Sequence, residues 1–184
     1  MLTNDQREYV KLAVRPMQII VAALATGVGI FFAIVFVIPP IARLAGGPPA
    51  EPLVSYIAAA AGLAGIFAWA VVPRIITAGI RQSIVHGKPA PPAGLSQNLP
   101  MTDERLQIRP LIAMYQNSLI VGGAILEGAA FFNLVAYMLE QQPMNLVVAG
   151  VLLLLLLSQI PTVSRLESWI ETELTTIDQL RLIR

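Results

Sequence analysis

The chain has 184 residues, of which 56% are hydrophobic and 12% are charged, with a net charge of +1 and no cysteine. Its mean hydropathy is +0.71, and its charged fraction is about half that of an ordinary soluble domain. These values place the chain in a membrane, exclude disulfides and thiolate chemistry, and leave no basic domain for a nucleic-acid backbone.

Four apolar stretches are long enough to cross the hydrocarbon core as helices, which takes about 20 residues for about 30 Å. They lie near Met17–Pro39, Leu53–Val72, Leu119–Leu139 and Leu146–Pro161. Continuous rather than alternating apolar runs favour helices over a barrel. The sequence therefore predicts an all-α integral membrane four-helix bundle of two transmembrane hairpins, which is a single membrane domain over residues 1–184.

In chain order, a cytoplasmic N-terminal tail is followed by the first hairpin, a cytoplasmic loop, the second hairpin and a C-terminal helix. The predicted bounds are 1–16, 17–85, 86–109, 110–163 and 164–184. The loop is rich in proline, and Thr102 or Asp103 after it offers an N-cap for a short cytoplasmic helix that leads to the third span.

The C-terminal segment has apolar residues at helical spacing, which predicts an amphipathic cytoplasmic helix. The apolar residues are Leu166, Trp169, Ile170, Leu174, Ile177 and Leu180, and the predicted solvated side carries Glu167, Glu171, Glu173 and Asp178. Such a helix fits a position in the headgroup region or against the cytoplasmic loop. The alternative is a docking helix for a soluble partner.

The basic residues predict the orientation of the spans. All but one of the twelve lie in the two tails and the central loop, and only Arg43 lies in an outer connection. Because cytoplasmic loops carry the excess of lysine and arginine, both termini and the central loop are predicted to face the cytoplasm, in a multi-pass protein of the cell (inner) membrane.

The two hairpins resemble each other at a shift of 100 residues. The first span then aligns with the third, with Phe31 over Phe131 among the identities and Gly27 opposite Glu127. Chance identities are frequent between sequences this apolar. A tandem duplication and a coincidence therefore both stay open.

Glu127 is the most informative residue, because it is a lone carboxylate inside the apolar run Leu119–Leu139. An ionised carboxylate at bilayer depth costs roughly 2.5 to more than 10 kcal/mol, so it usually faces a partner, a water-filled cavity or an ion path. Small residues around it allow another helix to come close. The predicted packing residues are Gly123, Ala124, Gly128 and Ala130. The low dielectric of such a seam favours a protonated Glu127 near neutral pH.

The run Leu119–Leu139 resembles the carboxylate-bearing outer helix of the c subunit (proteolipid) of rotary ATP synthases, where small residues lead to a Glu or Asp followed by an aromatic and an aliphatic stretch. Ala58–Gly65 is similar to the family's small-residue inner helix, and Arg81-Gln82 to the start of its polar loop. The resemblance is best over Leu119–Leu139. It implies that Glu127 binds and releases a proton or a sodium ion.

The alternative is a non-transporting membrane scaffold or accessory subunit in which Glu127 fastens helices. Its predicted hydrogen-bond partners are Thr26, Gln159 and Ser158. Such bonds contribute about 0.6 kcal/mol on average in membranes, so this role needs no transport. Asn133 lies about 120° around the helix from Glu127, and it is predicted to form hydrogen bonds in a helix seam rather than to act as a co-ligand of Glu127.

No enzyme is predicted, since no second catalytic group reaches the depth of Glu127. The single histidine, His86, lies in the proline-rich loop, so no histidine cluster for a metal or a nucleophile is expected. We expect no cofactor and no metal. The expected partners are the lipid bilayer and either a second copy of the chain or a partner in a membrane complex, but no nucleic acid.

Overall fold

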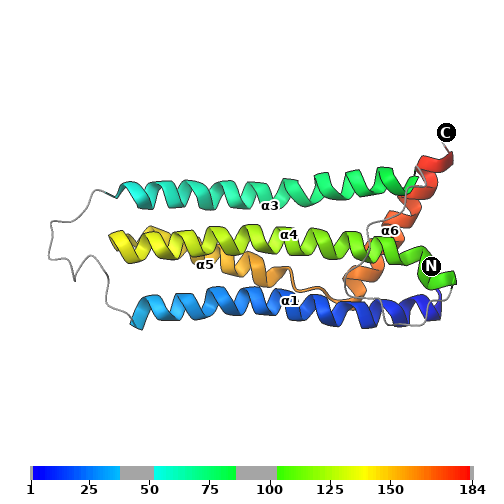
Figure 1. The fold of residues 1–184 in the computed structure, drawn as a ribbon, viewed down its shortest axis with the longest axis horizontal. Helices are drawn as coiled ribbons and strands as arrows, with labels where there is room; N and C mark the ends of the chain where they lie inside the picture. The colour runs from blue at the N-terminus through cyan, green and yellow to red at the C-terminus, as the bar shows by residue number, and fades with distance from the viewer. Residues whose placement is uncertain (1, 38–51, 86–102, 183–184) are drawn as a thin grey trace. The chain divides into compact units, whose positions relative to one another are not determined.

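The computed structural model describes residues 2–37, 52–85 and 103–182, and in these ranges the chain forms five α-helices and is all-α (Figure 1). The helices are α1 at Asn4–Val37, α3 at Leu53–Val85, α4 at Asp103–Glu140, α5 at Pro143–Ser158 and α6 at Val163–Leu182. The outer connection that contains Arg43 lies outside the described residues, as does the proline-rich part of the central loop with His86 and Thr102.

Three helices are long and apolar enough to cross a membrane: α1, Leu53–Gln82 of α3 and Ile108–Glu140 of α4. Helix α5 has 16 residues, which at about 1.5 Å each is shorter than the hydrocarbon core. It makes a fourth span only if α5 and α6 are taken together as one bent pair. By hydropathy the chain is thus a multi-pass helical membrane protein with three or four spans.

Three helices extend further than predicted, and each contains a proline. Helix α1 begins at Asn4 rather than near Met17 and passes through Pro16, so most of the predicted N-terminal tail is helical. Helix α3 does not end near Val72 but continues through Pro73 to Val85. Helix α4 begins at Asp103 and passes through Pro110, so the predicted short cytoplasmic helix and the end of the predicted loop are its first turns. A proline removes one backbone donor, and neighbouring groups in membrane helices can compensate for it, so the helix resumes.

The chain divides into two compact units. Unit 1 contains Met1–Ile20, Pro73–Ile120 and Ile160–Arg184, and unit 2 contains Val21–Val72 and Val121–Gln159. The basic residues whose side chains are described all belong to unit 1; they are Arg7, Lys11, Arg15, Arg74, Arg81, Arg109 and Arg165. The described basic residues on which the predicted orientation depends therefore lie together in unit 1. The side that faces the cytoplasm stays a prediction, as does the division into consecutive hairpins.

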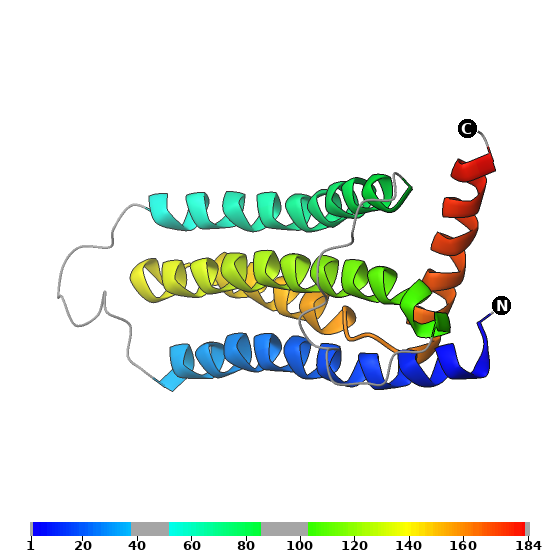
Figure 2. The same ribbon diagram turned by 45° about the vertical axis from the view of Figure 1, so that its right-hand side comes forward.

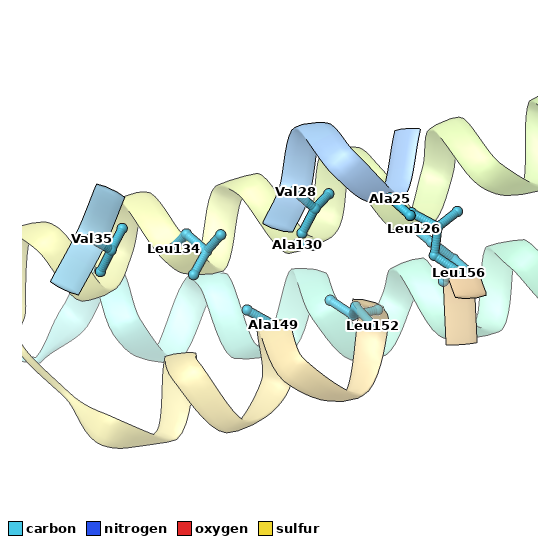
Figure 3. Close-up of a cluster of buried hydrophobic side chains, with 9 residues drawn as sticks. All are labelled: Ala25, Val28, Val35, Leu126, Ala130, Leu134, Ala149, Leu152 and Leu156. Atoms are coloured by element: carbon cyan, nitrogen blue, oxygen red, sulfur yellow. The ribbon is translucent and has the colours of Figure 1, made fainter. Parts of the chain in front are cut away.

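In unit 2, parts of α1, α3 and α4 lie with α5 around an apolar core (Figure 1). The buried core residues repeat at helical spacing and point toward one another between α1, α4 and α5 (Figure 3). They are Ala25, Val28, Val35, Leu126, Ala130, Leu134, Ala149, Leu152 and Leu156. All nine are aliphatic, so this core depends on close van der Waals packing rather than on polar bonds.

The turn between α4 and α5 is short, and it is held by polar contacts. Gln141 has a positive φ of 57°, and its N–H donates to the carbonyl of Tyr137 at 2.8 Å, which ends α4 in a left-handed cap. The Glu140 carboxylate accepts from the backbone N–H groups of Val54 and Ser55 at 2.8 and 2.7 Å. Glu140 thereby satisfies free donors at the start of α3 and fixes that end against α4.

In unit 1, α6 is grouped with the first part of α1, the last part of α3 and the first part of α4 (Figure 2). Leu166, Ile170 and Ile177 are buried, and the Trp169 ring meets the Tyr115 ring edge-on with centroids 5.1 Å apart. The amphipathic helix is confirmed, but the prediction that Glu173 belongs to its solvated side is wrong. Glu173 is buried rather than solvated, because its position continues the buried stripe.

Candidate functional site: the membrane carboxylate Glu127

Glu127 lies in unit 2, where α4 meets α1. Its Oε1 atom is 3.5 Å from the point where a Cβ of Gly27 would stand, and the Phe131 ring edge is 3.8 Å from the same point. Glu127 and Phe131 are one turn apart on α4, so both side chains face the same stretch of α1. A Cβ at Gly27 would be in ordinary van der Waals contact with the carboxyl group, so the two positions face each other directly across the helix pair. The sequence analysis did not predict this contact, although the 100-residue shift had placed the two positions opposite each other.

Aromatic packing holds the same helix pair together one turn further along. The rings of Phe31 and Phe131 lie edge to face, with centroids 5.3 Å apart and an interplanar angle of 67°. Such a pair is favourable beyond the area it buries. Positions related by the 100-residue shift thus contact each other twice, at Gly27 and Glu127 and at the two phenylalanines. This arrangement is expected for helices related by a two-fold axis, while the duplication itself stays a prediction.

The predicted small residues around Glu127 fall into two groups. Gly123 is buried, and a Cβ there would stand 2.9 Å from Leu24 Cδ1; Ala130 is buried in the core of unit 2. Ala124 is exposed, and Gly128 is exposed with nothing within 4 Å of its Cβ position. The first two serve close packing within the chain. The latter two do not, because they lie on the outward side of α4.

The three predicted hydrogen-bond partners have other surroundings. Thr26 is exposed, Ser158 donates its hydroxyl to the Leu155 carbonyl at 2.6 Å, and Nε2 of Gln159 is buried without a hydrogen-bond partner. Among the bonds found in the described part of the chain, none joins Glu127 to any of these three. Their role as partners of Glu127 therefore has no support from the geometry and stays a prediction.

Asn133 lies on a different face of α4 from Glu127, as predicted. Its side-chain amide donates to the carbonyl oxygens of Ala58 on α3 and Ala129 at 3.0 and 2.9 Å. Asn145 of α5 adds a second bond in the same unit, to the Ser55 hydroxyl at 2.7 Å. The structure thus separates an α3 seam with asparagine hydrogen bonds from an α1 seam that contains Glu127.

Within the described ranges, no three His, Cys, Asp or Glu side chains come together as a metal site would require. Comparisons of the chain with protein-family models, with curated proteins and with solved structures found no match.

Proposed function

We propose that this multi-pass membrane protein takes up and releases a proton at Glu127 within the bilayer. The observation that carries the proposal is the position of the carboxyl group beside Gly27, with no hydrogen bond to it found in the described chain. An ionised carboxylate at this depth is costly, and neither Gly27 nor Phe131 offers a side-chain donor to stabilise it. The neutral acid is therefore the resting form, and ionisation requires access to water or to a passing cation.

A proton fits these surroundings better than a sodium ion. A metal cation needs several oxygen ligands to replace its hydration shell, whereas a carboxyl group binds a proton alone. Gly27, which faces Oε1 of Glu127, has no side chain that could serve as a ligand, and no hydrogen bond or ion pair joins Glu127 to another residue of the described ranges. The resemblance of Leu119–Leu139 to the carboxylate helix of c subunits supports the same proposal, since such a helix carries an ion by reversible protonation or binding.

The first test is proton flux into liposomes that contain the purified full-length chain. We expect Glu127→Gln to reduce the flux to that of protein-free liposomes, because the amide keeps the shape but cannot ionise. Glu127→Asp keeps the carboxyl group and should retain part of the flux. Parent-like flux in Glu127→Gln would reject the proposal.

Labelling with dicyclohexylcarbodiimide gives an independent readout of protonation. This apolar reagent attacks protonated carboxyl groups, so labelling of Glu127 should decrease as the pH rises. Glu140 is a control on the same helix, because it accepts two backbone hydrogen bonds as a carboxylate and should remain unlabelled. Failure of Glu127 to react at any pH would show that it is not a titrating acid open to the lipid.

The second candidate function is a scaffold that assembles with a copy of itself. Ala124 and Gly128 favour it, because they are exposed, small and four residues apart on α4, which is a spacing that lets membrane helices approach. In that case Gly128→Leu should dissociate the assembly without unfolding the chain, since nothing of the chain lies near its Cβ. For such a scaffold, the proton flux into liposomes should be the same for the parent chain and for Glu127→Gln.

A further inference from the structure

A cleft in unit 1 has no part in the proposal for Glu127. It has a volume of about 340 Å³, which is at the small end of ligand pockets. The cleft lies among α3, α4 and α6. Its polar lining consists of Arg74, Thr77, Arg81, Ser118, Trp169 and Glu173.

The charges in the cleft leave one cation unbalanced. Arg81 donates two hydrogen bonds to Glu173, at 2.9 and 2.6 Å, so these two charges cancel in a bidentate pair. Arg74 is exposed, and no ion pair or hydrogen bond to it is found in the residues that the structure describes. The lining therefore has a net charge of about +1 and attracts an anion.

Hydrogen-bond donors stand around this charge. Arg74 and Arg81 are seven residues apart on α3 and share a face of that helix. Ser118 supplies a hydroxyl and Trp169 an indole N–H. Thr77 differs from them, because its hydroxyl already donates to the Pro73 carbonyl at 2.7 Å. Two guanidinium groups and two neutral donors are a suitable set for the oxygens of a phosphate.

The cleft lies where the apolar segments end. On α3 no charged residue occurs between Leu53 and Pro73, and Arg74 follows at once. On α4, Ser118 directly precedes the apolar run that starts at Leu119. In a membrane this level corresponds to the lipid headgroups, where basic pockets between helices bind anionic lipids.

The geometry points to a binding site for a phosphate group whose charge is not balanced by a cation on the same molecule. Arg74 is the main contact. Arg81 supplies the second guanidinium, which Glu173 holds in place, and Trp169 and Ser118 contribute neutral donors. The phosphate can belong to an anionic phospholipid headgroup or to a small soluble phosphate.

Trp169 offers a direct readout, since the chain has only two tryptophans and the other, Trp69, belongs to unit 2. In a Trp69→Phe background, Trp169 fluorescence is followed in non-ionic detergent with three probes. These are dihexanoyl phosphatidylglycerol, dihexanoyl phosphatidylcholine and glycerol 3-phosphate. A saturable change with the first probe alone assigns the site to a lipid headgroup, and a change with the first and third assigns it to phosphate from either source.

Two substitutions in the cleft, Arg74→Gln and Glu173→Gln, should change phosphate binding in opposite directions. Arg74→Gln should weaken binding about tenfold or more, the usual loss for a hydrogen bond to a charged group. Arg15→Gln is the matched control, because Arg15 is an exposed arginine of the same unit that does not line the cleft. Glu173→Gln removes the anion and should tighten binding several-fold, a gain that misfolding cannot produce.

The proposal is overturned if none of the probes gives a saturable change, or if phosphatidylcholine binds as well as phosphatidylglycerol. It is equally overturned if Arg74→Gln and Arg15→Gln reduce binding to the same extent, since the attraction would then be the general effect of surface charge.

Discussion

Gly65→Leu is expected to lower the free energy of unfolding by about 2–3 kcal/mol. A Cβ at Gly65 of α3 would stand 2.8 Å from the Cβ of Ala129 on α4. Ala129 cannot rotate its side chain away, because its Cβ is fixed to the helix backbone. The substitution therefore forces α3 and α4 apart, and with them the bond between Asn133 and the Ala58 carbonyl. Unfolding in mixed micelles, followed by circular dichroism, measures the loss.

Gly79→Leu is the matched control for this prediction. Gly79 lies on the same helix with nothing within 4 Å of its Cβ position, and replacing a helical glycine removes a helix-propensity cost of about 1 kcal/mol. We expect the control to be neutral or slightly stabilising. If the two variants have the same free energy of unfolding, the folded protein does not contain the close contact between α3 and α4.

Arg81→Met is expected to destabilise the chain by about 2 kcal/mol or more. Removing one partner of a buried ion pair costs about 3–5 kcal/mol, and the value is discounted here because the Arg81 side chain is 29% exposed. The Glu173 side chain is only 8% exposed, so its carboxylate would be left buried without the guanidinium that it bonds. The decrease in the free energy of unfolding should appear in the same unfolding experiment in mixed micelles.

The double variant Arg81→Met with Glu173→Leu separates this cause from a general loss of packing. Replacing both members of a buried pair with apolar residues is often neutral, so the second substitution should restore most of the stability. A double-mutant cycle over the two positions then gives a coupling energy. If the double variant is as unstable as the sum of the single ones, the two side chains do not act as a pair.

The apolar runs of the sequence were enough to predict the helices, because a segment in lipid has few ways to satisfy its backbone. Helix ends were less predictable. Pro73 and Pro110 are typical helix boundaries in soluble proteins, yet α3 and α4 continue through them. The predicted fourth span was Leu146–Pro161, whereas α5 covers Pro143–Ser158. An apolar run predicts a helix well but its first and last residue poorly.

Of the candidate site, the sequence indicated the carboxylate but not its neighbours. A charge in an apolar run is visible without a fold, whereas the contact with Gly27 depends on how α1 and α4 are rotated. Glycine and alanine occur all along both helices, so the small-residue pattern does not single out one face. This is why Gly123 packs inside the chain while Ala124 and Gly128 face outward.

Glu173 shows the opposite case, because its spacing along the sequence already indicated a buried position. It lies three residues after Ile170 and four before Ile177, both of which are buried, so its spacing is that of the buried stripe. Acidic side chains on an amphipathic helix are usually solvated. A buried position for Glu173 required a cation, and Arg81 supplies it from another helix, ninety-two residues away in the sequence.

The glycine opposite Glu127 also bears on the stoichiometry of the proposed proton site. Because positions 27 and 127 face each other across one helix contact, Gly27→Glu would place two acids side by side, and two such carboxyl groups share a proton instead of titrating separately. With glycine at one position, this helix contact contains one carboxyl group in each chain. Under the proposed function, each chain therefore takes up and releases protons one at a time at this contact.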